Sequence, residues 1–172
     1  MDIKNLGHIG FNVSDWDAAI KFYCEGLGFK RIYTVTFADL YRQMLSDMEA
    51  GTAAFDVNEA VLNTFRGMGD TPWHSYLQIV PGQCLELFYN YNDKPLAGDL
   101  SGKCCYSHCA IIVDDLEKAW EELEEKGIKA DTQIQIGPDF TKQFWLSDPD
   151  GNKLELMEYT DKSFQMVKTI WE

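Results

Sequence analysis

The sequence predicts an α+β fold built from two tandem βαβββ units. Residues 8–23 and 108–123 align with each other without a gap, and each copy begins with a histidine. Residues 85–88 and 154–157 form a second match, because both read Leu-Glu-Leu followed by a large apolar residue. Self-similarity of this kind indicates a repeated structural unit. The second match has a shorter offset than the first, so the first copy carries an insertion of about 31 residues.

Each copy opens with a strand and then a helix. Residues 6–13 and 106–113 are short, rich in β-branched or aromatic residues and bounded by turn signals, which is typical of strands. Apolar residues then recur at helical spacing, and a glycine follows as a C-terminal stop in both copies. Ser14 and Asp114 are the predicted N-caps of these helices, because each precedes a carboxylate by three residues.

Three further strands are predicted in each copy. Explicit turns separate the last two of them: Pro81-Gly82 in the first copy and Asp-Pro-Asp-Gly-Asn at residues 148–152 in the second. The expected strands are 29–37, 73–80 and 83–91 in the first copy and 129–136, 141–146 and 153–159 in the second.

The remaining segments complete one domain over residues 1–172, with the first unit at 1–91 and the second at 104–159. The inserted segment, residues 38–69, has apolar residues at helical spacing and predicts two short helices. The tail, residues 160–172, predicts a helix that docks against the body or a partner chain. Its apolar face consists of Phe164, Val167, Ile170 and Trp171.

Charge and composition exclude several classes of protein. The 15 basic and 28 acidic residues give a formal net charge of −13, which disfavours nucleic acid and anionic lipid as partners. The longest purely aliphatic run covers only residues 110–113, and no signal-peptide segment follows the first residues. The five cysteines are odd in number and form no pair of zinc knuckles, so they are expected to be reduced. We therefore expect a cytoplasmic protein.

Four side chains at matching positions of the two copies form the candidate site: His8, Glu86, His108 and Glu155. Strand alternation turns the leucines of each Leu-Glu-Leu toward the helix-covered face and the glutamate toward the opposite face. Two units packed side by side would bring two imidazoles and two carboxylates together. This set suits Ni²⁺, Co²⁺, Zn²⁺, Mn²⁺ or Fe²⁺ better than Ca²⁺ or Mg²⁺. His74 has no counterpart and is expected to be structural.

These features resemble the vicinal oxygen chelate superfamily, which includes glyoxalases, bleomycin resistance proteins and dioxygenases. The most specific part of the resemblance is the Asp-Pro-Asp-Gly-Asn-Lys-Leu-Glu-Leu run at residues 148–156. The resemblance implies that two units form a cupped, incompletely closed β-barrel with helices outside and a metal on the concave side. The ligand order His, Glu, His, Glu is similar to glyoxalase I (lactoylglutathione lyase). Methylmalonyl-CoA epimerases usually carry Gln where this chain has Glu86, and extradiol dioxygenases use three protein ligands.

The resemblance implies a metal-dependent lyase or isomerase that moves a proton next to a metal-chelated carbonyl through an enediolate. Its base would be Glu155, and Glu86 or a metal-bound water would complete the return of the proton. Ni²⁺, Co²⁺ or Zn²⁺ is the expected ion, with Mn²⁺ or Fe²⁺ as alternatives. A small-molecule substrate and a homodimer are expected. The connector, residues 92–103, is flexible enough for one site to draw on one chain or on two.

Two other functions stay open. An epimerase, isomerase or lyase acting on a 2-hydroxy-carbonyl or sugar-derived substrate would use the same four ligands. A non-catalytic protein that binds a small molecule or antibiotic typically lacks them. The inserted segment could place a lid with Phe65, Met68 and Trp73 over the pocket, which questions a glutathione hemithioacetal as substrate. The sequence does not identify the substrate.

Overall fold

The structure of the chain is a computed structural model. It describes residues 6–51, 58–91 and 107–168. Several features of the sequence lie outside the described residues, namely the predicted connector at 92–103, Cys104, Cys105, Ile170 and Trp171.

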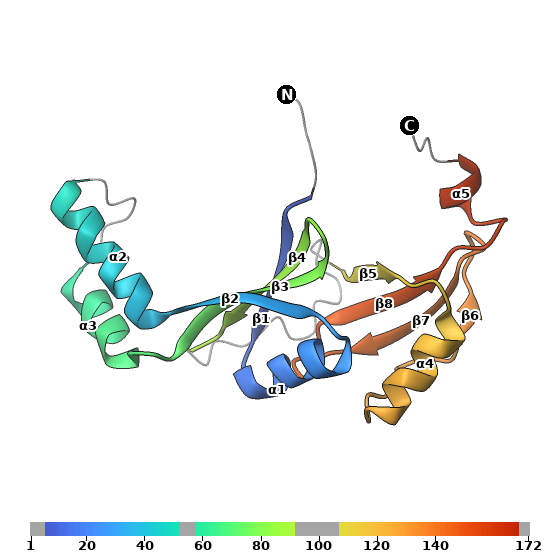
Figure 1. Cartoon of the computed structure of the whole chain (residues 1–172), viewed down its shortest axis with the longest axis horizontal. Coiled ribbons are helices and arrows are strands. Elements are labelled where there is room, and N and C mark those ends of the chain that lie inside the picture. The colour runs from blue at the N-terminus through green and yellow to red at the C-terminus, as the bar shows by residue number, and fades with distance from the viewer. Residues whose placement is uncertain (1–5, 52–57, 92–106, 169–172) are drawn as a thin grey trace. The chain divides into compact units, whose positions relative to one another are not determined.

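The chain divides into two compact units (Figure 1). The first unit contains the described residues of Met1–Trp16 and Phe29–Asn92. The second unit contains Asp17–Gly28 and the described residues of Asp93–Glu172. The helical segment that follows the first strand therefore groups with the second copy of the repeat, although the sequence places it in the first copy.

The first unit is built on a four-stranded sheet with the strand order β1-β4-β3-β2. β1 runs parallel to β4, and the β4–β3 and β3–β2 pairs are antiparallel. In β4, Leu85 and Leu87 are 1% and 0% exposed, so their face of the sheet forms the core of this unit. Glu86 lies between them and faces the other side. The strands are β1 (His8–Val13), β2 (Lys30–Thr36), β3 (Pro72–Val80) and β4 (Gln83–Tyr89).

The described residues of the insertion form two helices. Thr36 begins the first of them with a capping box, in which its side chain and that of Asp39 each bind the other residue's backbone N–H. Phe37 and Phe65 pack together between the helices, with their ring centroids 5.4 Å apart. Phe65 therefore belongs to the core of the insertion, while a lid stays a prediction. The two helices are α2 (Phe37–Ala50) and α3 (Glu59–Met68).

The sheet of the second unit repeats this topology, with the strand order β5-β8-β7-β6. β5 is parallel to β8, and the other pairs are antiparallel. Leu154 and Leu156 are buried on one face, as their counterparts are in the first unit. The predicted α+β class with two βαβββ units is confirmed. The strands are β5 (Cys109–Ile112), β6 (Gln135–Ile136), β7 (Lys142–Ser147) and β8 (Lys153–Glu158).

The strand predicted at residues 129–136 is wrong over most of its length, because β6 has only two residues. One backbone hydrogen bond, from Asp131 N–H to Trp145 C=O, and several side-chain bonds hold the preceding segment to the sheet. The Thr132 hydroxyl accepts a hydrogen bond from the Trp145 N–H, and the Asp131 carboxylate accepts bonds from Ser147 and Lys153. These contacts replace the regular pairing that the apolar pattern predicted.

Three helical segments belong to the second half of the chain or group with it: α4 (Leu116–Glu125), α5 (Phe164–Lys168) and α1 (Trp16–Ile20) with its π-helical continuation η1 (Lys21–Gly26). The N-cap of α4 is Asp115, not the predicted Asp114, because Val113 N–H still bonds to Met157 C=O and the chain turns one residue later.

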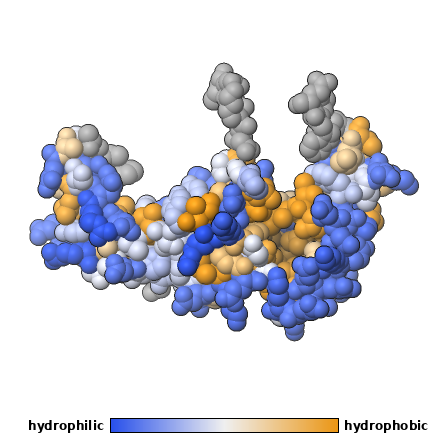
Figure 2. Space-filling model, in the orientation of Figure 1, coloured by the Kyte–Doolittle hydropathy of each residue, from blue (hydrophilic) through white to orange (hydrophobic). Residues whose placement is uncertain are grey.

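The outward face of α4 is strongly hydrophilic (Figure 2). Within the described residues, no helix combines the length and apolarity that crossing a bilayer requires.

Candidate metal-binding site

In the first unit, His8 and Glu86 come from the neighbouring parallel strands β1 and β4. Their register places Gly10, which has no side chain, directly beside Glu86, and His8 two residues before Gly10 on the same face. His8 Nε2 lies 3.1 Å from Glu86 Oε2. The Glu86 side chain is only 8% exposed, so its charge needs a partner.

Two residues of β3 complete this cluster. His74 Nδ1 lies 2.5 Å from Glu86 Oε1, so both oxygens of the carboxylate have an imidazole partner. The Tyr76 hydroxyl lies 2.9 Å from His8 Nδ1 and fixes the other side of that ring. Burial and the negative charge of Glu86 raise the pKa of Tyr76, which keeps its hydroxyl protonated at neutral pH.

The second unit holds the equivalent pair. His108 directly precedes β5, and its Nε2 lies 3.3 Å from Glu155 Oε2 of β8. The ring of His108 rests against Trp145, with centroids 4.7 Å apart, and its Nδ1 lies 3.1 Å from the Ser107 hydroxyl. Burial raises the pKa of Glu155 above its ordinary value, which outweighs the lowering effect of His108, and the charge of Asp139 adds to the rise.

The geometry of each pair fits the ligands of a transition-metal ion. Two ligands about 2.1 Å from one ion lie roughly 3.0–3.4 Å apart at octahedral or tetrahedral angles. The N–O distances of 3.1 Å for His8 and Glu86 and 3.3 Å for His108 and Glu155 match this spacing. Imidazole nitrogen with carboxylate oxygen is also a donor set that such ions accept. The residues present in each unit therefore fit a divalent metal ion.

The structure brings the predicted residues together as two pairs, one in each unit, and the sharing of one ion by both pairs stays a prediction. His74 and Tyr76 are the residues of this cluster that sequence reasoning missed. Strand alternation could have indicated them, because His74 and Tyr76 share one face of β3 and Tyr76 pairs directly with Glu86. Neither residue is repeated in the second copy, so the internal repeat does not indicate them.

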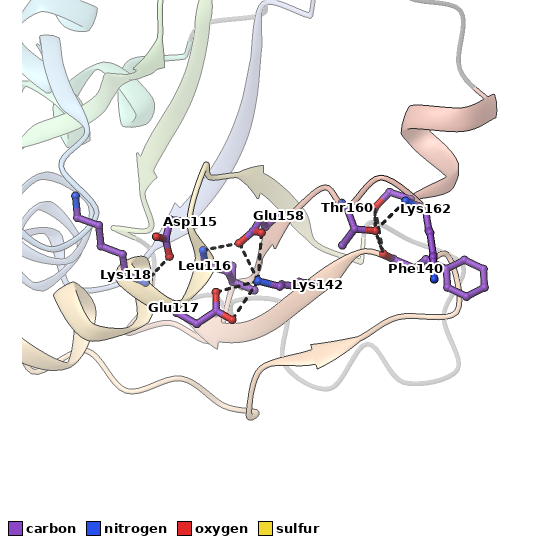
Figure 3. A network of polar contacts seen from close by, with 10 residues as sticks. Asp115, Leu116, Glu117, Lys118, Phe140, Lys142, Glu158, Thr160 and Lys162 are labelled. Atoms are coloured by element: carbon purple, nitrogen blue, oxygen red, sulfur yellow. Dashed lines mark hydrogen bonds and ion pairs between the residues drawn. The ribbon is translucent and has the colours of Figure 1, made fainter.

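Among the described residues, one other group has the spacing of a metal site: Asp115, Glu117 and Glu158. Figure 3 shows the Lys142 amine between the last two of these carboxylates, 3.1 Å from Glu117 and 3.2 Å from Glu158. The Asp115 carboxylate caps α4 at Lys118 N–H. The acidic group is thus accounted for by a lysine and a helix terminus, and no ion is needed to explain it.

Comparison with known proteins extends these observations. The model of the Glyoxalase/Bleomycin resistance protein/Dioxygenase superfamily matches residues 5–156. The crystal structure of the glyoxalase family protein from Enterococcus faecalis has a TM-score of 0.64 and 23% sequence identity, and the match covers 92% of this chain and 100% of that one. The superfamily match confirms the resemblance inferred from the sequence.

Two curated relatives are more similar in sequence. The probable lactoylglutathione lyase, chloroplastic, of Arabidopsis thaliana is 30% identical over 161 residues. That match covers 91% of this chain but only 36% of the Arabidopsis protein. The uncharacterized protein YwkD of Bacillus subtilis (strain 168) is 31% identical over 159 residues, which are 92% of this chain and 99% of YwkD.

Proposed function

Because the chain belongs to the Glyoxalase/Bleomycin resistance protein/Dioxygenase superfamily, we propose that it is a metal-dependent lyase or isomerase of the glyoxalase I kind. Its reaction is the transfer of a proton at the carbon next to a carbonyl group. The observation that carries the proposal is the pair of His–Glu contacts, one in each unit, with the spacing of metal ligands. The likeness to a relative named lactoylglutathione lyase supports the same class of reaction.

Members of this family generally bind a divalent metal ion. In this chain the ligands are His8, Glu86, His108 and Glu155. Ni²⁺, Co²⁺ or Zn²⁺ suits them best, and Mn²⁺ or Fe²⁺ is an alternative. When bound, the ion supplies Lewis acidity to a substrate carbonyl, which makes the neighbouring C–H more acidic.

The two glutamates have different roles in this proposal. Glu155 accepts the proton from the carbon and returns it, because His108 is its one hydrogen-bonding partner among the described residues. One of its oxygens is therefore available to a substrate. Glu86 is engaged at both oxygens, so it keeps its place as the second carboxylate of the site. A base within hydrogen-bonding reach of the C–H contributes about 10²–10⁴-fold to the rate.

The substrate class follows from this chemistry and not from a recognised pocket. Methylglyoxal–thiol adducts, including the glutathione hemithioacetal, carry the required carbonyl with an adjacent hydroxyl. Other 2-hydroxy-carbonyl compounds, such as keto sugars, carry the same group and would be epimerised or isomerised by the same residues. A screen of methylglyoxal–thiol adducts, 2-hydroxy ketones and keto sugars in D₂O, with deuterium uptake into product as the readout, distinguishes them.

The decisive variant is Glu155→Gln. We expect it to retain most of the bound metal and to lose exchange of the substrate proton with solvent by at least about 100-fold, because Gln cannot accept the proton. Metal content by elemental analysis and deuterium uptake in D₂O measure the two effects. Glu121→Gln, at an exposed position of α4, is the matched control and should change neither.

Three results would contradict the proposal. Normal turnover by Glu155→Gln would remove the base. Less than about a tenth of an equivalent of transition metal, not restored by added Ni²⁺, Co²⁺ or Zn²⁺, would favour a small-molecule or antibiotic-binding protein. Consumption of O₂ with substrate would indicate an oxygenase.

A further inference from the structure

The His74 side chain is held by a hydrogen bond and by contacts with neighbouring aromatic rings. Its side chain is 12% exposed, and its Nδ1 lies 2.5 Å from Glu86 Oε1. The ring is stacked on Phe88, with an interplanar angle of 15°, and meets the edge of Trp73 at a centroid distance of 4.8 Å. The aromatic neighbours fix the plane of the imidazole, and the hydrogen bond fixes its direction.

The position of His74 separates it from the metal ligands. His8 and His74 approach opposite oxygens of the Glu86 carboxylate. Among the described residues, the donor atoms of Asp115, Glu117 and Glu158 all lie within 4.8 Å of one another. His8, Glu86 and His74 do not form such a group. His74 thus contacts the far side of a ligand instead of sharing its ion.

The hydrogen bond has a defined direction. An ionised carboxylate only accepts hydrogen bonds, so His74 donates its Nδ1–H to Glu86 Oε1. This bond prevents rotation of the carboxylate about its last torsion and leaves Oε2 directed at His8. Hydrogen bonds of this kind to a metal-ligating carboxylate are typically worth about 10–100-fold in metal affinity or activity.

Within its described residues, the second unit has no equivalent of this contact. The residue opposite Glu86 is Tyr76 and the residue opposite Glu155 is Trp145, so the register matches His74 with Gln143. Among the described residues, Gln143 makes no hydrogen bond to Glu155. The two repeated glutamates therefore differ in one respect: Glu86 has a second imidazole partner and Glu155 does not.

We propose that His74 is a positioning residue that locks Glu86 as the fixed carboxylate of the site and thereby leaves the movement of a carboxylate to Glu155. The proposal rests on the proposed function, since Glu86 must be a metal ligand for its orientation to matter. His74 has no counterpart in the second copy of the repeat. In this proposal it accounts for the different roles of Glu86 and Glu155, which stand at equivalent positions of the two copies.

The test compares His74→Phe with His74→Asn. Phe keeps the aromatic packing but removes the donor, while Asn restores an N–H near the position of Nδ1. Competition with a chromophoric chelator measures the Kd for Ni²⁺, and steady-state kinetics measures kcat and KM on the substrate found in the screen. We expect His74→Phe to weaken Ni²⁺ binding by about 10–100-fold and His74→Asn to recover most of the loss. Gln143→Leu, the matched control in the second unit, should leave the Kd unchanged.

Wild-type Ni²⁺ affinity in a folded His74→Phe protein would overturn the proposal, as would an equal loss in His74→Phe and His74→Asn. Circular dichroism and thermal unfolding in EDTA establish that each variant is folded, and His74→Asn carries the comparison if His74→Phe does not fold. Failure of the wild-type protein to bind Ni²⁺, Co²⁺ or Zn²⁺ would overturn both this proposal and the proposed function. Binding by the wild-type protein with no effect of His74→Phe would overturn this one alone.

Discussion

The Asp148 side chain stabilises the Asp-Pro-Asp-Gly-Asn turn at residues 148–152. Its Oδ1 accepts hydrogen bonds from the backbone N–H groups of Asp150 and Asn152, at 2.9 and 2.8 Å. Its Oδ2 accepts from the Asn152 side chain and from the Tyr23 hydroxyl, both at 2.8 Å. The carboxylate is buried, so these four bonds replace its hydration and hold the turn between β7 and β8. The register of β8, and with it the place of Glu155, depends on this turn.

Replacing Tyr23 with Phe should lower the free energy of unfolding by about 1.5–3 kcal/mol, because a buried hydrogen bond to a charged group is lost. Urea denaturation measures the change. Tyr41→Phe is the control, because Tyr41 lies on α2 and makes no polar contact within the described residues. It should shift the free energy by less than about 0.5 kcal/mol. Equal stability of Tyr23→Phe and the wild type would show that this bond contributes nothing.

The helical segment α1–η1 lies in the first copy of the repeat by sequence, and its residues 17–28 group with the second unit. It begins at Trp16 and ends as a π-helix at Gly26, with Leu27 N–H bonding to Phe22 C=O. The Lys126 amine donates a 2.7 Å hydrogen bond to the Gly26 carbonyl, and the Ile128 side chain lies against the Gly26 Cα. A Cβ at Gly26 would lie 2.2 Å from Ile128 Cδ1, the far end of a flexible side chain, so this methyl group must move when residue 26 carries a side chain.

Gly26→Ala should therefore lower the free energy of unfolding by less than about 1 kcal/mol, because Ile128 Cδ1 can move away and relieve most of the overpacking. Adding Ile128→Val should restore most of the loss, because valine lacks the clashing Cδ1. Thermal or urea unfolding of the single and double variants measures this coupling. Gly67→Ala on α3 is the matched control, since nothing lies within 4 Å of its Cβ position and alanine favours the helix by up to about 1 kcal/mol. A double variant no more stable than Gly26→Ala would contradict the clash.

The molecule as a whole is acidic, with a net charge of −13, and cations are enriched around such a surface. This general enrichment of cations does not depend on particular residues, whereas binding at a specific metal site does. In the proposed function one ion takes ligands from both copies of the repeat, and its binding then stabilises both units together. The stability of the protein should accordingly depend on metal as it depends on a specific ligand.

Metal removal tests this coupling. We expect one equivalent of Ni²⁺ per chain and a gain of about 2.7 kcal/mol in unfolding free energy at a free concentration 100 times the Kd. His8→Ala and His108→Ala, in different units, should each abolish the gain, and EDTA should reverse it in the wild type. Asp115→Asn, in the acidic group beside Lys142, should leave it intact. Two equivalents per chain, or a full gain in either histidine variant, would contradict a single shared ion.

Local patterns in the sequence determined much of this protein. The repeat predicted the two βαβββ units, and strand alternation predicted that Glu86 and Glu155 turn away from their buried leucine neighbours. Both inferences depend on properties of neighbouring residues, which strand and helix periods translate directly into faces. Repetition also selected His8 and Glu86 as candidate site residues, and the structure places these two side chains beside each other.

Tertiary structure decided the features that depend on contacts between distant segments. His74 has no counterpart in the repeat, and only the pairing of β3 with β4 brings its ring to Glu86. The grouping of residues 17–28 with the second copy depends on contacts such as Tyr23 with Asp148, which are 125 positions apart. The strand expected at 129–136 is reduced to two residues, and the side chains of Asp131 and Thr132 form hydrogen bonds to β7. Such contacts are set by the meeting of surfaces in three dimensions, and no period in the chain encodes them.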